Sequence, residues 1–82
     1  MPRKPFPIGS IKADGRPGRL NLHAEPETMG DRKVWRIYAS SCSDCWSCEV
    51  YGETRPEAVQ AAIASWPGEW DLRLSREAKG YL

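Results

Sequence analysis

Three regularly spaced cysteines are the residues of this sequence whose types and positions best suit chemistry. They are Cys42, Cys45 and Cys48, which form two overlapping Cys-x-x-Cys pairs. A Cys-x-x-Cys pair on a tight turn brings two sulfurs to one point, as tetrahedral zinc requires. Cys48 and His23, the single histidine, are the candidates for the third and fourth ligands of a structural zinc ion.

This ligand set is incomplete, because a zinc ribbon carries a second Cys-x-x-Cys pair at a distance and the sequence has none. Asp44 and Glu49 are weaker ligand candidates. Ordinary thiols in a reducing cytoplasm are therefore favoured over one structural zinc ion. A thioredoxin-like redox role fits less well, because that motif lies at the N-terminus of a helix and these cysteines lie between predicted strands.

The sequence offers little for catalysis. It has no glycine-rich phosphate loop and no nucleophile elbow, and its carboxylates are scattered. A lone histidine in a predicted strand is typical of a surface or structural residue. We therefore predict that the protein is not an enzyme.

Length and charge limit the remaining classes. The chain has 82 residues, which suits one small domain with a limited core. A net charge of +1 argues against an acidic nucleic-acid mimic and against a strongly basic nucleic-acid binder. Basic residues nevertheless gather near the start, where Asp14 is the one acidic residue among Arg3, Lys4, Lys12, Arg16 and Arg19.

We predict two parts in the chain. Residues 1–19, rich in proline, glycine and basic residues, form an extended arm, which is either a solvated leader or a surface-contacting segment. Residues 20–82 form a single α+β domain. Prolines interrupt the first residues and no apolar stretch follows, so we expect no signal peptide, no membrane span and a cytoplasmic protein.

The segment 54–66 is predicted to be a helix. Thr54 and Glu57 have the spacing of a capping box, and Pro67 with Gly68 ends the helix. Four apolar residues then fall on one helical face, namely Val59, Ala62, Ile63 and Trp66.

Alternating apolar residues predict strands at 20–24, 33–40 and 47–51. Residues 25–31 are predicted to be a polar loop, residues 69–75 an edge strand or strap, and residues 75–82 are left unassigned. The expected fold is a small antiparallel sheet of about three strands, with one possible edge strand, packed by one helix in a zinc-ribbon-like ββ(β)α arrangement. Its expected core residues on the sheet are Leu20, Leu22, Trp35, Ile37 and Val50.

The run from Trp35 to Trp66 resembles the C-terminal half of the restriction-alleviation (Lar-type) proteins, which are small and zinc-ribbon-like. Their pattern is a strand entering a Cys-x-x-Cys knuckle, here Cys42 and Cys45, then a second strand and a threonine-initiated helix ending in tryptophan. The family's first knuckle corresponds to Lys4–Ser10, where Phe6 replaces one cysteine and Ile8 with Gly9 occupies the place of the other. The glycine after the second knuckle is replaced by Trp46.

This resemblance implies a phage- or prophage-encoded inhibitor of a host DNA-targeting defence system, acting on a restriction or CRISPR effector by protein–protein binding. Trp, Tyr and Arg are the residue types that carry most binding energy at interfaces. The expected interface residues are Trp46, Tyr38 and Arg36, together with Arg3, Lys4, Lys12, Arg16 and Arg19 of the arm.

Two alternatives remain open. The first is a small nucleic-acid-binding zinc-ribbon module, in which the basic arm contacts phosphates while Trp46 and Tyr38 stack on bases. The second is a structural subunit of a phage particle or of another assembly.

Overall fold

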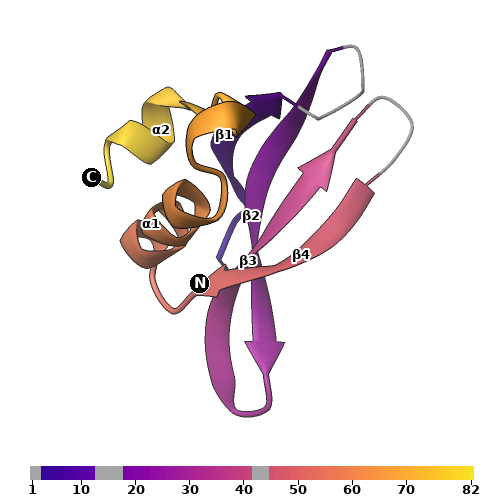
Figure 1. Cartoon of the computed structure of the whole chain (residues 1–82). Coiled ribbons are helices and arrows are strands. Elements are labelled where there is room, and N and C mark those ends of the chain that lie inside the picture. Colours follow the sequence, from indigo (N-terminus) through magenta and orange to yellow (C-terminus); the bar gives the residue numbers. More distant parts are fainter. Residues whose placement is uncertain (1–2, 13–17, 42–44) are drawn as a thin grey trace.

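Alternating apolar side chains build an antiparallel five-stranded sheet in the computed structural model, which describes residues 3–12, 18–41 and 45–82. Its strands follow the order β4-β3-β2-β1-β5 (Figure 1). The bounds are β1 (Phe6–Lys12), β2 (Arg19–Met29), β3 (Arg32–Ser40), β4 (Cys45–Gly52) and β5 (Arg73–Leu74).

Both α-helices lie on the same side of this sheet (Figure 1). α1 (Arg55–Ser65) packs against β4 and β3, and α2 (Arg76–Lys79) packs against β1, with a 3-10 turn, η1 (Gly68–Trp70), between them. The predicted α+β class is therefore confirmed. The sequence predicted about three strands, one possible edge strand and one helix. The described residues instead form five strands and two short α-helices.

The capped helix forms where the sequence predicts it. The Thr54 hydroxyl accepts a hydrogen bond from the backbone N–H of Glu57 at 3.3 Å. The Glu57 carboxylate accepts from the backbone N–H of Glu53 at 3.1 Å, one residue earlier than the capping box predicts. The Thr54 contact satisfies one of the first-turn N–H groups of α1, which lack a carbonyl partner within the helix, and the Glu57 contact satisfies the N–H of the residue just before the cap.

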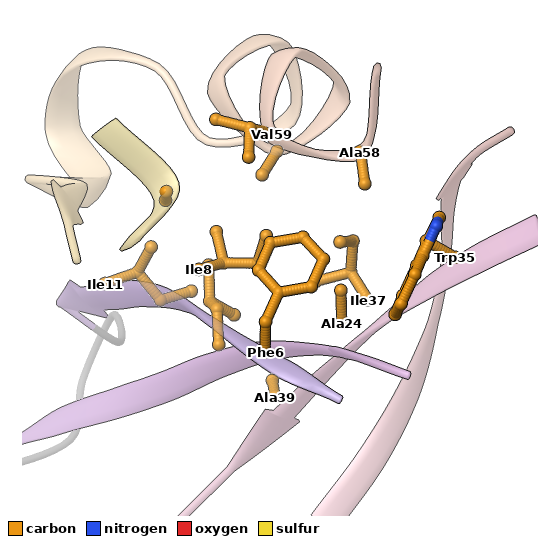
Figure 2. Close-up of a cluster of buried hydrophobic side chains, with 12 residues drawn as sticks. Phe6, Ile8, Ile11, Ala24, Trp35, Ile37, Ala39, Ala58 and Val59 are labelled. Atoms are coloured by element: carbon orange, nitrogen blue, oxygen red, sulfur yellow. The ribbon is translucent and has the colours of Figure 1, made fainter. Parts of the chain in front are cut away.

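The core lies between the sheet and the two helices (Figure 2). Leu22, Ile37 and Val59 are fully buried there in one cluster, and α1 packs against β3 as predicted. Ile63, Trp66, Leu20 and Val50 pack at the margin of this core. Each fully buried aliphatic side chain stabilises the fold by roughly 1.5–3 kcal/mol.

The predicted N-terminal arm contains a strand of the sheet. In β1 the side chains of Phe6, Ile8 and Ile11 are buried in the core. The register of β1 against β2 shifts between Pro7 and Gly9, which brings residues at uneven spacing onto one face. This bulge hides the strand from a search for strict alternation. Phe6 and Ile8, which the resemblance would align with a first cysteine knuckle, are thus core residues.

Gly9 allows β5 to approach β1. Its φ is 153°, and a Cβ atom there would lie 2.0 Å from the carbonyl oxygen of Arg73. β5 pairs with β1 at Gly9 and Ser10. Directly after β5, Ser75 donates its backbone N–H to the Ile8 carbonyl at 2.8 Å and its hydroxyl to the Pro7 carbonyl at 2.7 Å. Of residues 69–75, predicted to be an edge strand or a strap, Arg73 and Leu74 form the edge strand β5, whereas Glu69 and Trp70 belong to the 3-10 turn η1.

The predicted polar loop at 25–31 is wrong. β2 continues to Met29 and joins β3 through a turn at Gly30 and Asp31. Pro26 is tolerated in this strand because β1 pairs with β2 no further than Ala24, which leaves β2 with one neighbour at Pro26.

The unassigned C-terminal residues close one end of the core. Ser75 caps α2, and Ala78 is buried. The Arg55 guanidinium lies 5.5, 5.0 and 5.9 Å from the ring centres of Phe6, Trp35 and Tyr81 and donates to the Tyr81 hydroxyl at 2.7 Å. Within the described residues, no helix has the length and apolar character needed to cross a membrane.

Candidate interface on the open face of the sheet

The face of the sheet opposite the helices is mostly polar, although alternation and register also place Val34 of β3 there, with 3% of its surface exposed. Leu22 and Ala24 of β2 are buried against the core, so His23 between them points to the other side. Ile37 and Ala39 of β3 likewise place Tyr38 on that side. We call this side the open face; alternation and register assign to it His23, Glu25 and Glu27 of β2, Arg36 and Tyr38 of β3, and Ser47 and Tyr51 of β4.

Two rings form the centre of the open face. His23 and Tyr38 are opposite each other in the register, and their ring centres lie 5.6 Å apart with planes inclined by 18°. The Tyr38 hydroxyl donates a hydrogen bond to the Glu27 carboxylate. That hydrogen bond is the main reason that the pKa of Tyr38 is raised above its usual 10.0, with desolvation adding to it. The contact also holds the ring in place.

Charged groups extend this network toward the β2–β3 turn. The Arg36 guanidinium lies 4.0 Å from the Glu27 carboxylate, and His23 Nε2 lies 3.4 Å from a carboxylate oxygen of Glu25. Arg36 Nε is buried and has no hydrogen-bond partner among the described residues. The network therefore offers a cation, two rings and carboxylates on one surface, which suits recognition of another molecule.

The predicted interface residue Trp46 lies elsewhere. It is opposite Ala39, whose side chain is buried on the helix side of the sheet, so Trp46 and Tyr38 project from opposite faces. Trp46 keeps 36% of its surface exposed. The expected cluster is thus divided, with Arg36 and Tyr38 on the open face and Trp46 on the helix side.

The predicted arm residue Arg3 is held by contacts within the chain, whereas its neighbour Lys4 is not held in this way by any described residue. Arg3 donates to the carbonyls of Val34 and Glu27, both at 3.2 Å, and its guanidinium lies 5.2 Å from the ring centre of Trp35. Lys4 is exposed before β1. These positions give the basic residues separate surroundings rather than one continuous patch.

Arg19 crosses β1 to reach η1. It donates to the Ser10 hydroxyl at 2.9 Å and forms an ion pair with Asp71 at 3.0 Å. Its hydrogen bond, followed by the charge of Arg73, lowers the pKa of the Asp71 carboxyl below 3.8. Lys12, opposite Arg19 in the register, is exposed, and Arg16 lies outside the described residues.

The predicted metal ligands do not come together in the part of the chain that the structure describes. Cys48 packs against the core on the helix side, where burial raises the pKa of its thiol, whereas His23 lies on the open face. Cys45 is exposed at the start of β4, and Cys42 lies outside the described residues. Those residues contain no group of three or more His, Cys, Asp or Glu side chains arranged for a metal ion. Cys48 and His23 therefore do not fit one shared zinc site.

Two residues of the open face were not among the predicted interface residues. His23 was predicted only as a candidate metal ligand, and Tyr51, which is 46% exposed, was not singled out. The useful signal was the alternation itself, since it places both on the same side as Arg36 and Tyr38 once the strand order is known.

Comparison with known proteins adds no relative from which to transfer a function. No family model matches the chain, and no curated protein and no solved structure matches it.

Proposed function

We propose that this chain is a phage- or prophage-encoded, non-enzymatic inhibitor that binds a protein of a host DNA-targeting defence system in the host cytoplasm. The partner class rests on the resemblance of Trp35–Trp66 to the restriction-alleviation proteins. The binding mode rests on the open face, which is the observation that carries the proposal.

The open face suits protein binding for a physical reason. Both helices pack on the other side of the sheet, so Arg36, Tyr38 and Tyr51 remain accessible on a surface formed by neighbouring strands. Tyrosine and arginine contribute large contact areas and charged hydrogen bonds at protein interfaces. The contacts of Tyr38 and Arg36 with Glu27 hold both side chains in place before binding, which reduces the entropy lost on association.

We propose that β3 and β4 correspond to the strands beside the second cysteine knuckle of the restriction-alleviation proteins, and that the protein needs no metal for its function. Elemental analysis of the purified protein measures its zinc content directly. We expect EDTA to leave the melting temperature unchanged. A clear loss of stability on chelation, together with loss of zinc in Cys45→Ser, would instead establish a structural metal.

The experiment mixes the purified protein with a purified restriction complex and, separately, with a CRISPR effector complex. We expect one of the two to co-elute with it and to lose DNA cleavage. Tyr51→Ala on the open face should weaken the complex by at least tenfold, whereas Gln60→Ala, an exposed position on α1, should not. Absence of complex formation and of inhibition with both would refute the proposal.

The second candidate function is direct nucleic-acid binding, which the stacked rings of His23 and Tyr38 favour, since rings on an open sheet face can stack on bases. The carboxylates of Glu25 and Glu27 beside these rings disfavour it. A salt titration separates the two candidates, because affinity for nucleic acid falls steeply with salt. Tight, salt-sensitive binding to an oligonucleotide in the absence of any defence protein would favour the second candidate.

A further inference from the structure

The hairpin formed by β2 and β3 projects beyond the rest of the sheet. β1 pairs with β2 no further than Ala24, and β4 pairs with β3 no further than Trp35. Residues 27–34, which we call the hairpin tip, therefore form a two-stranded ribbon past the end of both neighbours. Figure 1 shows this ribbon extending away from the helices and from the opposite end of the sheet.

Several contacts hold the hairpin tip in place. Arg3 donates to the carbonyls of Glu27 and Val34, which face each other across the two strands, at 3.2 Å each. Tyr38 of β3 donates a hydrogen bond to the carboxylate of Glu27 in β2. Arg32 forms an ion pair with Glu53, which follows β4. A ribbon fixed in this way loses little conformational entropy when it is bound.

The hairpin tip presents an apolar side chain among charges of both signs. Met29 is 41% exposed, and only three other large hydrophobic side chains in the described residues are classed as exposed. Methionine is flexible and polarizable, so it adapts to irregular apolar surfaces. Lys33 is exposed and forms no ion pair with the described residues.

We propose that the hairpin tip inserts into a cleft of the partner protein, with Met29 against an apolar floor and Lys33 facing carboxylates at the rim. This inference rests on the proposed function and names the part of the chain that enters the partner. The tip carries two acidic residues, Glu27 and Asp31, against Arg32 and Lys33. This balanced charge, together with Met29, favours a protein cleft over the phosphates of nucleic acid.

The test measures the affinity of each variant for the defence complex that binds the wild-type chain. Met29→Asp should weaken binding by roughly thirtyfold or more, because it places a charge against the apolar floor. Lys33→Glu should weaken it by several fold. Leu82→Ala is the matched control, because it shortens another exposed apolar side chain at the C-terminus and should leave affinity unchanged.

A second measurement identifies the contact directly. A photo-crosslinking amino acid at position 29 should form a covalent adduct with the partner, and one at position 82 should not. If Met29→Asp binds as well as the wild type and position 29 gives no adduct, the hairpin inference is refuted while the proposed function stands. If the wild-type chain binds no defence complex, both fail. Adducts with nucleic acid alone would also overturn the inference.

Discussion

The two faces of the sheet carry different kinds of contact although they share the same strands. On the helix side, Leu22 and Ile37 are fully buried together with Val59 of α1. On the open face, His23 and Tyr38 from the same two strands remain partly exposed and make polar contacts. Alternate residues of one strand thus serve stability on one side and recognition on the other, which means that variants can separate the two roles.

The physical difference lies in how each face responds to a charge. Removal of apolar surface from water is the dominant stabilising effect on the helix side, and a charge there loses its hydration. Polar contacts on the open face exchange water for protein partners, so each contributes about 1.5 kcal/mol or less.

The largest effect is expected from Val59→Asp, which buries a charge where the wild-type side chain is 0% exposed. We expect a loss of about 3 kcal/mol or more in the free energy of unfolding, measured by urea denaturation. Ile63→Asp, at the margin of the core, should cost less, and Ser47→Asp on the open face should change stability by about 0.5 kcal/mol or less. Equal losses for Val59→Asp and Ser47→Asp would abolish the distinction between the faces.

Gly52→Ala tests the close approach of β4 to α1. A Cβ atom at Gly52 would lie 2.5 Å from the backbone nitrogen of Ala58, and neither backbone can yield easily. We expect a loss of about 1–3 kcal/mol in unfolding free energy. Gly80→Ala is the control, because its nearest contact would be 3.2 Å and its φ of −67° suits alanine. A stable Gly52→Ala variant would mean that the helix packs further from the sheet.

Tyr38→Phe removes the central hydrogen bond of the open face. We expect a loss of about 0.5–1.5 kcal/mol at neutral pH. Because folding raises the pKa of Tyr38, its contribution is fully present below pH 10.0 and is lost as the pH rises through the raised folded pKa. Urea unfolding at pH 7 and at alkaline pH should therefore show a smaller alkaline loss of stability in Tyr38→Phe than in the wild type. Tyr51→Phe is the control, and an identical pH dependence of Tyr38→Phe and the wild type would contradict the role of the hydrogen bond.

The smallest effect concerns the contact between Arg19 and Asp71. Folding lowers the pKa of Asp71, so its contribution to stability is present above pH 3.8 and is lost as the pH falls through the lowered folded pKa. In an NMR titration, Arg19→Gln should raise the pKa of the Asp71 carboxyl toward its usual value, and Arg73→Gln should raise it less. A greater rise in Arg73→Gln would reverse the assigned order of the two arginines.

Local sequence patterns predicted the parts whose physics is local. The helix was predictable because Thr54 caps it and its apolar residues recur with helical spacing. β3 was predictable because its side chains alternate regularly from Trp35 to Ser40. β1 was missed because its bulge breaks the alternation, and the end of β2 was missed because Pro26 and neighbouring polar residues resemble a loop.

The candidate interface was only partly predictable for a similar reason. Residue type suggested Tyr38, Arg36 and Trp46 together. The register of β3 and β4 separates Trp46 from the other two. Trp46 is opposite Ala39, the neighbour of Tyr38, and successive residues of a strand lie on opposite faces of the sheet. Arg3 and Arg19 were predicted to be interface residues of the arm, but both contact groups of this chain that are distant in the sequence.

The sequence by itself determined the α+β class, the capped helix and the central strands, because capping, side-chain spacing and alternation act between residues close in the chain. The tertiary structure alone decided which side of the sheet stays uncovered, how far the β2–β3 hairpin projects, and which cations are held internally. Those features depend on strand order and on contacts between segments far apart in the chain, such as Arg19 with Asp71, 52 residues away, which local patterns do not encode.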